Sequence, residues 1–345
     1  MDEPTLHALL KKGQEHVASD VLFKVGQPPA FRVSGELHYL QGDKLKPAQT
    51  RALAEIVLRR ARFKGTIDDL QQYDTSYGMS GIGRYRVNVY RQRGTLALAM
   101  RSIPLQIPTF EGLRIPSVCQ SLAELERGMI LVCGAAGNGK SSTLAAMVGH
   151  LNRTQRIHCV TIEDPIEFIH NDELASISQR EIGIDCADFA TALRAALRQD
   201  PDVILVGEVR DEETMDIALK ASETGHLVLS TLHTPDVQRT VGRVLALAGS
   251  DTQDVRERFA DNLKAIIAQR LLPRADAPGL ILAAEVLVVT GTARESIRRP
   301  DGNLPLKDVM ERGVHPYGMQ TFEMSMRDLV KEGLVDVETA RAALA

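Results

Sequence analysis

The first hundred residues contain short segments in which hydrophobic positions recur with the spacing of a helix or of a strand. Two amphipathic helices are predicted, at 5–19 and at 47–63, and Pro47 suits the first turn of the second. Extended segments are predicted at 21–25, 31–33, 84–90 and 95–100. This mixture of elements predicts a small α+β module.

The pattern changes after three prolines that fall close together. Pro104, Pro108 and Pro116 leave little room for a helix, and we interpret this segment as a linker. Beyond it, strand and helix patterns alternate, which is typical of a parallel sheet wound with helices. Strands are predicted at 129–133, 157–162, 203–206, 227–232 and 280–289, and helices from residue 140, at 189–198 and at 212–223. Only helical patterns follow the last strand.

Length and composition agree with this division. A chain of 345 residues with 44% hydrophobic and 25% charged residues is typical of a globular α/β protein of two domains. We expect a first domain at 1–103, a linker at 104–117, an α/β domain at 118–291 and a C-terminal helical subdomain at 292–345.

Targeting, membrane and cysteine signals are weak. The longest apolar run, 280–290, is interrupted by Glu285, and the acidic N-terminus lacks a signal-peptide core, so we expect a cytoplasmic protein without a transmembrane segment. Cys119, Cys133, Cys159 and Cys186 lie far apart, which argues against a zinc ribbon or a disulfide framework.

Charge is distributed unevenly along the chain. The net charge is −4, but residues 1–115 carry +6 and the rest −10. The basic excess is concentrated in five arginines within eighteen residues that contain no acid, namely Arg84, Arg86, Arg91, Arg93 and Arg101. Such a cluster requires an anionic partner or solvent.

A glycine-rich segment carries the strongest chemical signal. Residues 134–141 fit the pattern G-x-x-x-x-G-K-[ST] between an apolar strand and a helix. Backbone N–H groups would surround the β- and γ-phosphates of ATP, Lys140 would add positive charge, and Ser141 would offer a hydroxyl to Mg²⁺. The predicted nucleotide-binding residues of this loop are Gly134, Gly137, Asn138, Gly139, Lys140, Ser141 and Ser142. A glycine-rich turn without a ligand is the alternative.

Acidic residues follow two of the predicted strands. Glu163 stands at the carboxyl end of one strand, where ligands bind in parallel sheets, and is our candidate for orienting the attacking water. Glu208 follows 203–206, where an NTPase needs a carboxylate that holds Mg²⁺ through water. A solvated acidic loop is the alternative for Glu163.

Basic residues supply two further hypotheses. His226 and His233 flank the strand at 227–232, where a histidine could respond to a γ-phosphate, although such residues are more often polar caps. Arg86 and Arg101 lie on strands expected to pair, and they could reach over a nucleotide to compensate its charge. The alternative is a basic ribbon that faces solvent or nucleic acid.

Three motifs follow the loop in order: VTIEDPIEFIH, LRQDPDVILVGEVRDEETMDIAL and ASETGHLVLSTLHT. They resemble the Asp box, Walker B and His box of the secretion ATPases, and within these the PilT/PilU group of type IV pilus retraction ATPases. The resemblance spans nearly the whole chain, and includes GIGRYRVNVYRQRG, NLKAIIAQRLLP and GMQTFEMSMRDLV.

The resemblance implies a PAS-like N-terminal domain and a RecA-like ATPase domain, with ATP between them, in a hexameric ring. It implies Glu163 as catalytic glutamate, Glu208 in the Mg²⁺ and water network, and His226 and His233 near the γ-phosphate, with Arg86 and Arg101 extended to the nucleotide. Implied partners are an inner-membrane pilus platform protein and a paralogous motor ATPase, and no nucleic acid is expected.

Two departures from the family pattern bear on function. The loop reads GAAGNGKSS where relatives usually have GPTGSGKST, and the segment 293–299 only partly matches the AIRNLIRE-type motif linked to retraction. The first reading is a motor for pilus retraction. The alternatives are an accessory PilU-like subunit with low turnover, a pilus-assembly or secretion ATPase, and a DNA translocase.

Overall fold

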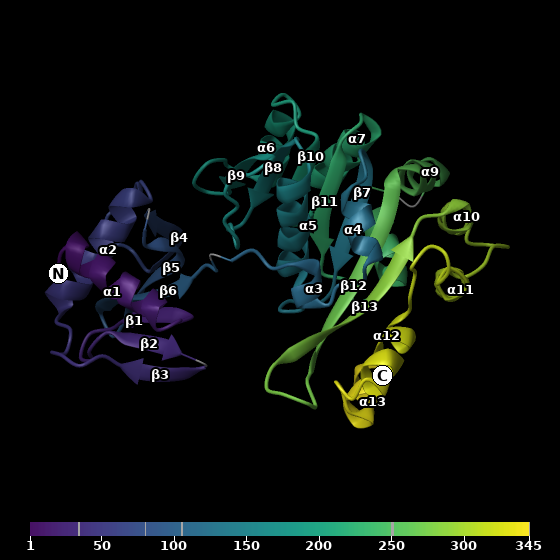
Figure 1. The fold of residues 1–345 in the computed structure, drawn as a ribbon. Coiled ribbons are helices and arrows are strands. Elements are labelled where there is room, and N and C mark those ends of the chain that lie inside the picture. The colour runs from purple at the N-terminus through teal and green to yellow at the C-terminus, as the bar shows by residue number, and fades with distance from the viewer. Residues whose placement is uncertain (34, 80, 105, 250–251, 345) are drawn as a thin grey trace. The chain divides into compact units, whose positions relative to one another are not determined.

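The computed structural model describes residues 1–33, 35–79, 81–104, 106–249 and 252–344. The chain forms two compact units (Figure 1). The first consists of Met1–Leu105 with Glu167–Ile169, and the second of Gln106–Ile166 with His170–Ala345.

The first unit is built on an antiparallel sheet of six strands in the order β3-β2-β1-β6-β5-β4. The strands are β1 (Asp20–Phe23), β2 (Ala30–Val33), β3 (Glu36–Tyr39), β4 (Gln72–Met79), β5 (Gly83–Gln92) and β6 (Thr95–Ser102). Its two helices are α1 (Glu3–Glu15) and α2 (Pro47–Arg60). In β5 the buried residues Tyr85, Val87 and Val89 alternate with the more exposed Arg86 and Asn88, as expected for a sheet with one face in the core.

The helices contribute to a core of their own on the buried face of this sheet. Leu6 and Leu10 of α1 and Leu53 of α2 are fully buried in one hydrophobic cluster with Val87 and Val89. The Tyr85 hydroxyl donates a hydrogen bond of 2.9 Å to the carbonyl of Leu10, which fixes α1 against the sheet. The arginine-bearing face of the sheet is therefore the one turned away from this core.

The second unit contains a sheet of seven strands in the order β13-β12-β7-β11-β10-β8-β9. Neighbouring strands are parallel except for β12 and β13, which form an antiparallel pair. The strands are β7 (Gly128–Cys133), β8 (His158–Glu163), β9 (Ser176–Glu181), β10 (Val203–Val206), β11 (Leu227–Leu232), β12 (Leu263–Pro273) and β13 (Leu280–Val288).

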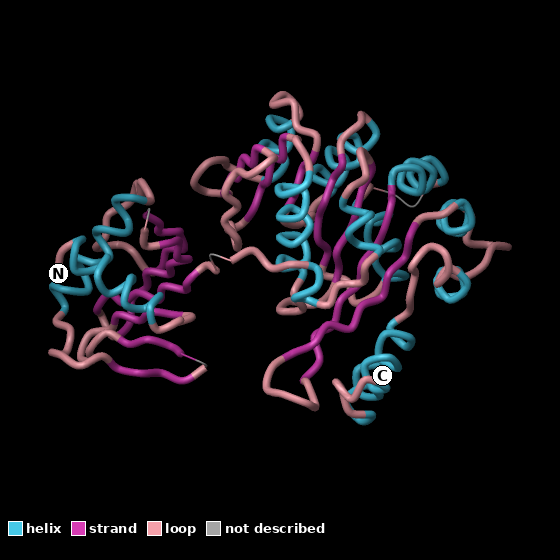
Figure 2. The backbone as a smooth tube through the Cα atoms, in the orientation of Figure 1, coloured by secondary structure: helices cyan, strands magenta, loops and turns pink. Residues whose placement is uncertain are grey.

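Helices cover both faces of this sheet (Figure 2). One face packs against α3, α4 and α5, and the other against the remaining helices. The helices are α3 (Phe110–Leu113), α4 (Val118–Ala123), α5 (Lys140–Thr154), α6 (Phe189–Ala196), α7 (Glu212–Glu223), α8 (Val237–Leu247), α9 (Gln253–Asn262), α10 (Gly291–Arg298), α11 (Leu306–Arg312), α12 (Phe322–Lys331) and α13 (Val337–Leu344).

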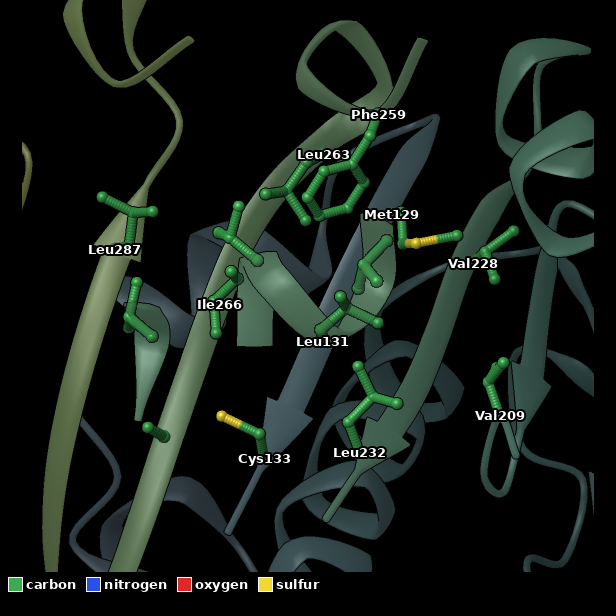
Figure 3. Packing of buried hydrophobic residues seen from close by; sticks show 14 of the residues in the cluster. Met129, Leu131, Cys133, Val209, Val228, Leu232, Phe259, Leu263, Ile266 and Leu287 are labelled. Atoms are coloured by element: carbon green, nitrogen blue, oxygen red, sulfur yellow. The ribbon is translucent and has the colours of Figure 1, made fainter. Parts of the chain in front are cut away.

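The central strands are buried on both faces, as their continuous apolar sequences require. All residues of β7 and β11 are buried. Figure 3 shows Met129, Leu131 and Cys133 of β7 on one face, next to Val228 and Leu232 of β11. This double burial makes the sheet a rigid frame for the loops at its strand ends.

The α/β class expected from the sequence is confirmed, while several details differ. The sheet is mixed rather than wholly parallel, and β3, β4, β9 and β12 were not predicted as strands. The first helix ends at Glu15 rather than at residue 19, because Val17 adopts a left-handed conformation with φ of 52°. The second ends at Arg60, just before Arg62 with the same φ. The segment 104–117 contains one helical turn, α3.

Candidate functional site

Four neighbouring strands end at the same edge of the second sheet. The strands β7, β11, β10 and β8 are consecutive and parallel, so their carboxyl ends lie side by side. Cys133 at the end of β7 pairs with Leu232, and Val206 at the end of β10 pairs with Ile162. The predicted loop, His233 and Glu208 follow three of these strands and Glu163 ends the fourth, and the fold therefore brings them to one edge.

The loop after β7 has the geometry of an anion-binding turn. Gly137 and Gly139 have φ of +82° and +78°, in the left-handed region that side-chain-bearing residues rarely adopt. Gly139 is also the N-cap of α5, so the loop leads directly into the N-terminus of a fifteen-residue helix. A Cβ added at Gly137 would meet no atom within 4 Å, which leaves open space at the loop. Backbone N–H groups and the helix dipole favour a phosphate here.

Lys140 lies within the curve of this loop. The residue is 8% exposed, and its Nζ donates hydrogen bonds to the carbonyl oxygens of Gly134 (2.9 Å) and Ala135 (3.0 Å). The ammonium group is thus held at the loop before any ligand binds. Ser141 and Ser142 follow in the first turn of α5 and are partly exposed. Asn138 uses its Oδ1 to accept a hydrogen bond from the backbone N–H of Leu271 in β12.

Glu163 is the last residue of β8, and its carboxylate is oriented by two neighbours. Its Oε1 accepts hydrogen bonds from the Thr161 hydroxyl (2.7 Å) and from Nε2 of Gln179 on β9 (3.2 Å). The residue is partly exposed. One carboxylate edge is therefore fixed by the protein, an arrangement that suits a group that must hold a water molecule in one direction.

Glu208 lies two residues beyond β10, between two basic side chains. Its carboxylate forms an ion pair with Arg210, and the hydrogen bond from Arg210 raises the pKa of the guanidinium above its ordinary value. On the other side, its Oε2 lies 3.4 Å from Nε2 of His233. The Glu208 side chain is 13% exposed, and that of His233 54%. The structure thus joins Glu208 and His233 directly.

His226 does not join this cluster, which corrects the expectation that both histidines lie near the γ-phosphate. It precedes β11, whereas His233 follows it, and six strand residues span about 20 Å. Its carbonyl accepts from the N–H of Gly128 at the start of β7, and its Nδ1 lies 3.0 Å from the carbonyl of Ala221. His226 is therefore a polar cap at the opposite edge of the sheet.

Arg86 and Arg101 belong to the first unit, where they face each other. They are cross-strand partners of β5 and β6 and are both exposed. Arg101 in turn pairs with Asp20, whose Oδ1 accepts from Arg101 Nε at 3.0 Å, and Asp20 pairs with Arg32. These four residues form one transverse row on the exposed face of the sheet, and we call Arg32, Asp20, Arg101 and Arg86 the arginine row. Arg84 bonds Ser76 on β4.

Several residues of the site did not emerge from sequence patterns. Thr161 and Gln179 orient Glu163, Arg210 pairs with Glu208, and Asp20 holds Arg101. Gln269 of β12 is buried and donates from Nε2 to the Thr143 hydroxyl at 2.6 Å. A lone glutamine inside the apolar run AIIAQRLL was the available signal for the last of these, since a buried amide requires a partner.

The donor set fits Mg²⁺ better than a transition metal. Ser141 and Glu208 offer hard oxygen atoms. Within the described ranges, no group of three or more His, Cys, Asp and Glu side chains could hold a metal ion. Mg²⁺ is usually bound through one or two protein oxygens together with waters and phosphate oxygens.

Among the helices that the structure describes, none combines the length and apolar character needed to cross a membrane. Burial raises the pKa of the Cys133 thiol, next to the loop, to about 12, so this group is a neutral part of the core.

Comparisons with known proteins agree with the geometry. The family model described as type II/IV secretion system protein matches residues 115–311. The type IV pilus ATPase PilU of Pseudomonas aeruginosa is 38% identical over 343 residues, 99% of this chain and 87% of that protein. The type IV pilus retraction ATPase PilT of the same organism is 37% identical over 334 residues, 96% of each chain.

A solved structure is similar over the same extent. The crystal structure of the pilus retraction motor PilT with bound ADP has a TM-score of 0.89 and 37% sequence identity, and the match covers 99% of this chain and 97% of that one. This chain therefore belongs to the type II/IV secretion ATPase family, as a nucleotide-binding type IV pilus ATPase of the PilT/PilU group.

Proposed function

We propose that this protein is a motor that hydrolyses Mg·ATP to power retraction of type IV pili. It would act as a homohexamer in the cytoplasm, docked on the platform protein at the inner-membrane base of the pilus. The observation that carries the proposal is the arrival of the phosphate-binding loop, Glu163, Glu208 and His233 at one edge of four adjacent parallel strands. Identity to PilT along 96% of each chain supports the retraction role.

The proposed chemistry divides among the residues already placed. The loop N–H groups and Lys140 bind the phosphates and compensate their charge. Glu163, oriented by Thr161 and Gln179, holds the attacking water in line with the γ-phosphate. Ser141 and Glu208 are the residues that would hold Mg²⁺, which when bound neutralises charge on the phosphate oxygens. His233 positions the Glu208 carboxylate.

Arg86 and Arg101 complete the proposal from the first unit. Phosphoryl transfer usually requires positive charge in addition to the loop lysine, delivered in cis or from a neighbouring subunit. The Arg101 side chain is 71% exposed, and its planar guanidinium can contact phosphate oxygens in a bidentate manner. The arginine row thus offers two cations, one of them already oriented by Asp20.

An accessory role is the second candidate. Identity to PilU is 38% over 99% of this chain, against 37% over 96% for PilT, and the partial match of residues 293–299 to the retraction-linked motif points the same way. Such a subunit would bind nucleotide beside a paralogous motor and turn it over slowly. A role in pilus assembly or secretion is a further alternative, and the relatives that cover nearly the whole chain do not favour it.

The test is Mg·ATP hydrolysis by the purified protein, with light scattering in the same buffer. We expect a hexamer whose hydrolysis falls by about 100-fold or more in Lys140→Ala and in Glu163→Gln. Glu173→Gln, the same change at an exposed residue in the connection between β8 and β9, is the matched control and should retain the rate of the unmodified protein.

The outcomes separate the candidates. A hexamer that binds ATP but hydrolyses it no faster than Glu163→Gln would replace the motor with the accessory role. If the protein hydrolyses ATP, a pilus-retraction assay in cells that lack the native gene decides whether the motor retracts or assembles pili. Extended pili that no longer shorten, and that shorten again on complementation, are the expected result.

A further inference from the structure

The strand β12 extends past the end of its neighbour β7. Pairing between the two stops at Ala268 and Cys133, after which β7 turns into the phosphate-binding loop. β12 continues to Pro273 and keeps its pairing with β13, where Leu271 faces Leu282. Residues 269–273 therefore present to the loop a strand edge that β7 does not cover.

Two hydrogen bonds and one close backbone approach join this edge to the loop and to the first turn of α5. Asn138 Oδ1 accepts the N–H of Leu271 at 3.1 Å, in the position that a strand carbonyl would otherwise occupy. Gln269 Nε2 donates to Thr143 in the first turn of α5 at 2.6 Å. The carbonyl oxygen of Gln269 lies so close to Gly134 that a Cβ there would stand 2.6 Å from it. The start, middle and end of the phosphate-binding segment thus rest on Gln269 and Leu271.

The residue between them points to the other face. Because side chains alternate along a strand, Arg270 faces the helices opposite α5. Its guanidinium carbon lies 4.3 Å from the ring centroid of Phe322, the first residue of α12, and the same group donates to the carbonyl of Ala343 in α13. Figure 1 shows α12 and α13 beside the β12–β13 pair.

We infer that residues 269–271 link the nucleotide site to the C-terminal helices α12 and α13, with Asn138 as the positioning residue that fastens the loop to β12. A ligand that reduces the motion of the loop also reduces the motion of Leu271, because Asn138 bonds the two. Arg270 extends this effect to the helices through its contacts with Phe322 and Ala343. Asparagine is suited to this role because its side-chain amide oxygen accepts the N–H of Leu271 directly. The inference rests on nucleotide binding at the loop, as proposed above.

Hydrogen exchange measured by mass spectrometry, with and without saturating ADP, tests the link. In the unmodified protein we expect ADP to slow exchange in the loop, at 269–273 and in α12 and α13, by about threefold to tenfold at the helices. Asn138→Ala should keep the slowing at the loop and lose it at the helices. Asn138→Asp retains the oxygen acceptor, so at saturating ADP the slowing at the helices should return although affinity falls.

Arg270→Met removes the charge but keeps the stem, and it tests the far end of the link. This change should abolish the slowing at α12 and α13 and leave it intact at 269–273. The matched controls are Asn303→Ala and Arg327→Met, the same kinds of change at exposed C-terminal positions, and both should behave like the unmodified protein.

ADP affinity, measured by calorimetry on the same samples, separates the two levels of argument. Failure of the unmodified protein to bind ADP would overturn the proposed function itself. Binding of ADP without slowing at the helices, or slowing that persists in Asn138→Ala, would overturn the link and leave the proposed function standing.

Discussion

Glu208 is the residue at which the chemistry of the site converges. Arg210 pairs with its carboxylate from one side and His233 from the other. Both partners are more than half exposed, whereas Glu208 is 13% exposed. The two exposed side chains thus hold a largely buried carboxylate in place. His233 therefore acts through Glu208, which distinguishes it from His226.

This difference gives a prediction for the two histidines. His233→Ala should lower ATP turnover by about tenfold or more, the rate equivalent of one hydrogen bond of ~1.4 kcal/mol. His226→Ala should change turnover by no more than about twofold, because its contacts are caps at the opposite edge. Steady-state hydrolysis by the two variants measures both effects, and an equal loss in each would contradict the placement.

The positions of Glu163, Glu208 and the loop could be predicted at the residue scale because each directly follows an apolar strand in sequence. Their partners could not. Gln179 reaches Glu163 only because β9 pairs with β8, a pairing that no local pattern encodes. For His226, closeness in sequence was misleading. His226 precedes β11 and His233 follows it, so the two histidines lie at opposite edges of the sheet although both adjoin the same strand.

At the scale of elements, β13 carries a carboxyl group into the core. Glu285 Oε2 accepts the N–H of Val237, the first residue of α8, at 2.8 Å. The pKa of Glu285 is raised to about 7: burial is the main cause, the hydrogen bond from Val237 opposes it, and the charges of Asp236 and Glu323 raise the pKa while that of Arg270 lowers it. A cavity of about 770 Å³ adjoins it, and the other charged residues that line this cavity are Asp236, Arg239, Arg256, Arg270, Lys307 and Glu323.

The raised pKa predicts a stability that falls as pH rises. Between about pH 4.5 and pH 7 the folded protein retains a proton on Glu285 that the unfolded chain has lost, so the free energy of unfolding declines by up to ~3 kcal/mol and then levels off. Glu285→Gln should remove this decline, and at about pH 8 the variant should be more stable than the unmodified protein.

Urea unfolding midpoints of both proteins at about pH 5 and about pH 8 test whether stability falls as pH rises. The difference between variant and unmodified protein should grow toward the higher pH. The exposed substitution Glu311→Gln is the matched control and should give the same difference at both values. A Glu285→Gln difference that is independent of pH would contradict the buried protonated state.

Elements with clear periodicity could be predicted, and those that depend on distant partners could not. The buried strands β7, β10 and β11 were expected from their continuous apolar runs. β12 has a similar run, but it is eleven residues long and carries Lys264, Gln269 and Arg270, and periodicity alone does not separate such a run from a buried helix. β9 is short and largely polar, and it becomes a strand only through its pairing with β8.

At the scale of the whole molecule, the two units have separate cores and different optical signals. The chain has no tryptophan and six tyrosines. Five of them, Tyr39, Tyr73, Tyr77, Tyr85 and Tyr90, lie in the first unit, and Tyr317 lies in the second. Tyrosine fluorescence therefore reports mainly on the unit that lacks the phosphate-binding loop.

We predict that ADP stabilises the two units unequally. At about 100 times its dissociation constant, a ligand adds ~2.7 kcal/mol to the unit that binds it. In urea, the midpoint seen by helical circular dichroism should therefore shift more than the midpoint seen by tyrosine fluorescence. Tyr317→Phe makes the fluorescence specific to the first unit. Equal shifts of both signals would show that the units unfold as one.

The order of strands has one more consequence. The loop, His233, Glu208 and Glu163 stand at the ends of four successive strands, and neighbouring strands of a sheet lie about 4.8 Å apart. The distance from β7, which precedes the loop, to β8, which ends at Glu163, is therefore about 14 Å. Backbone hydrogen bonds between the strands fix this distance. Amino-acid substitutions can change the side chain at each strand end, but they do not change the spacing between the strands. Any tuning of catalytic timing in this chain must come from the loops beyond the strand ends.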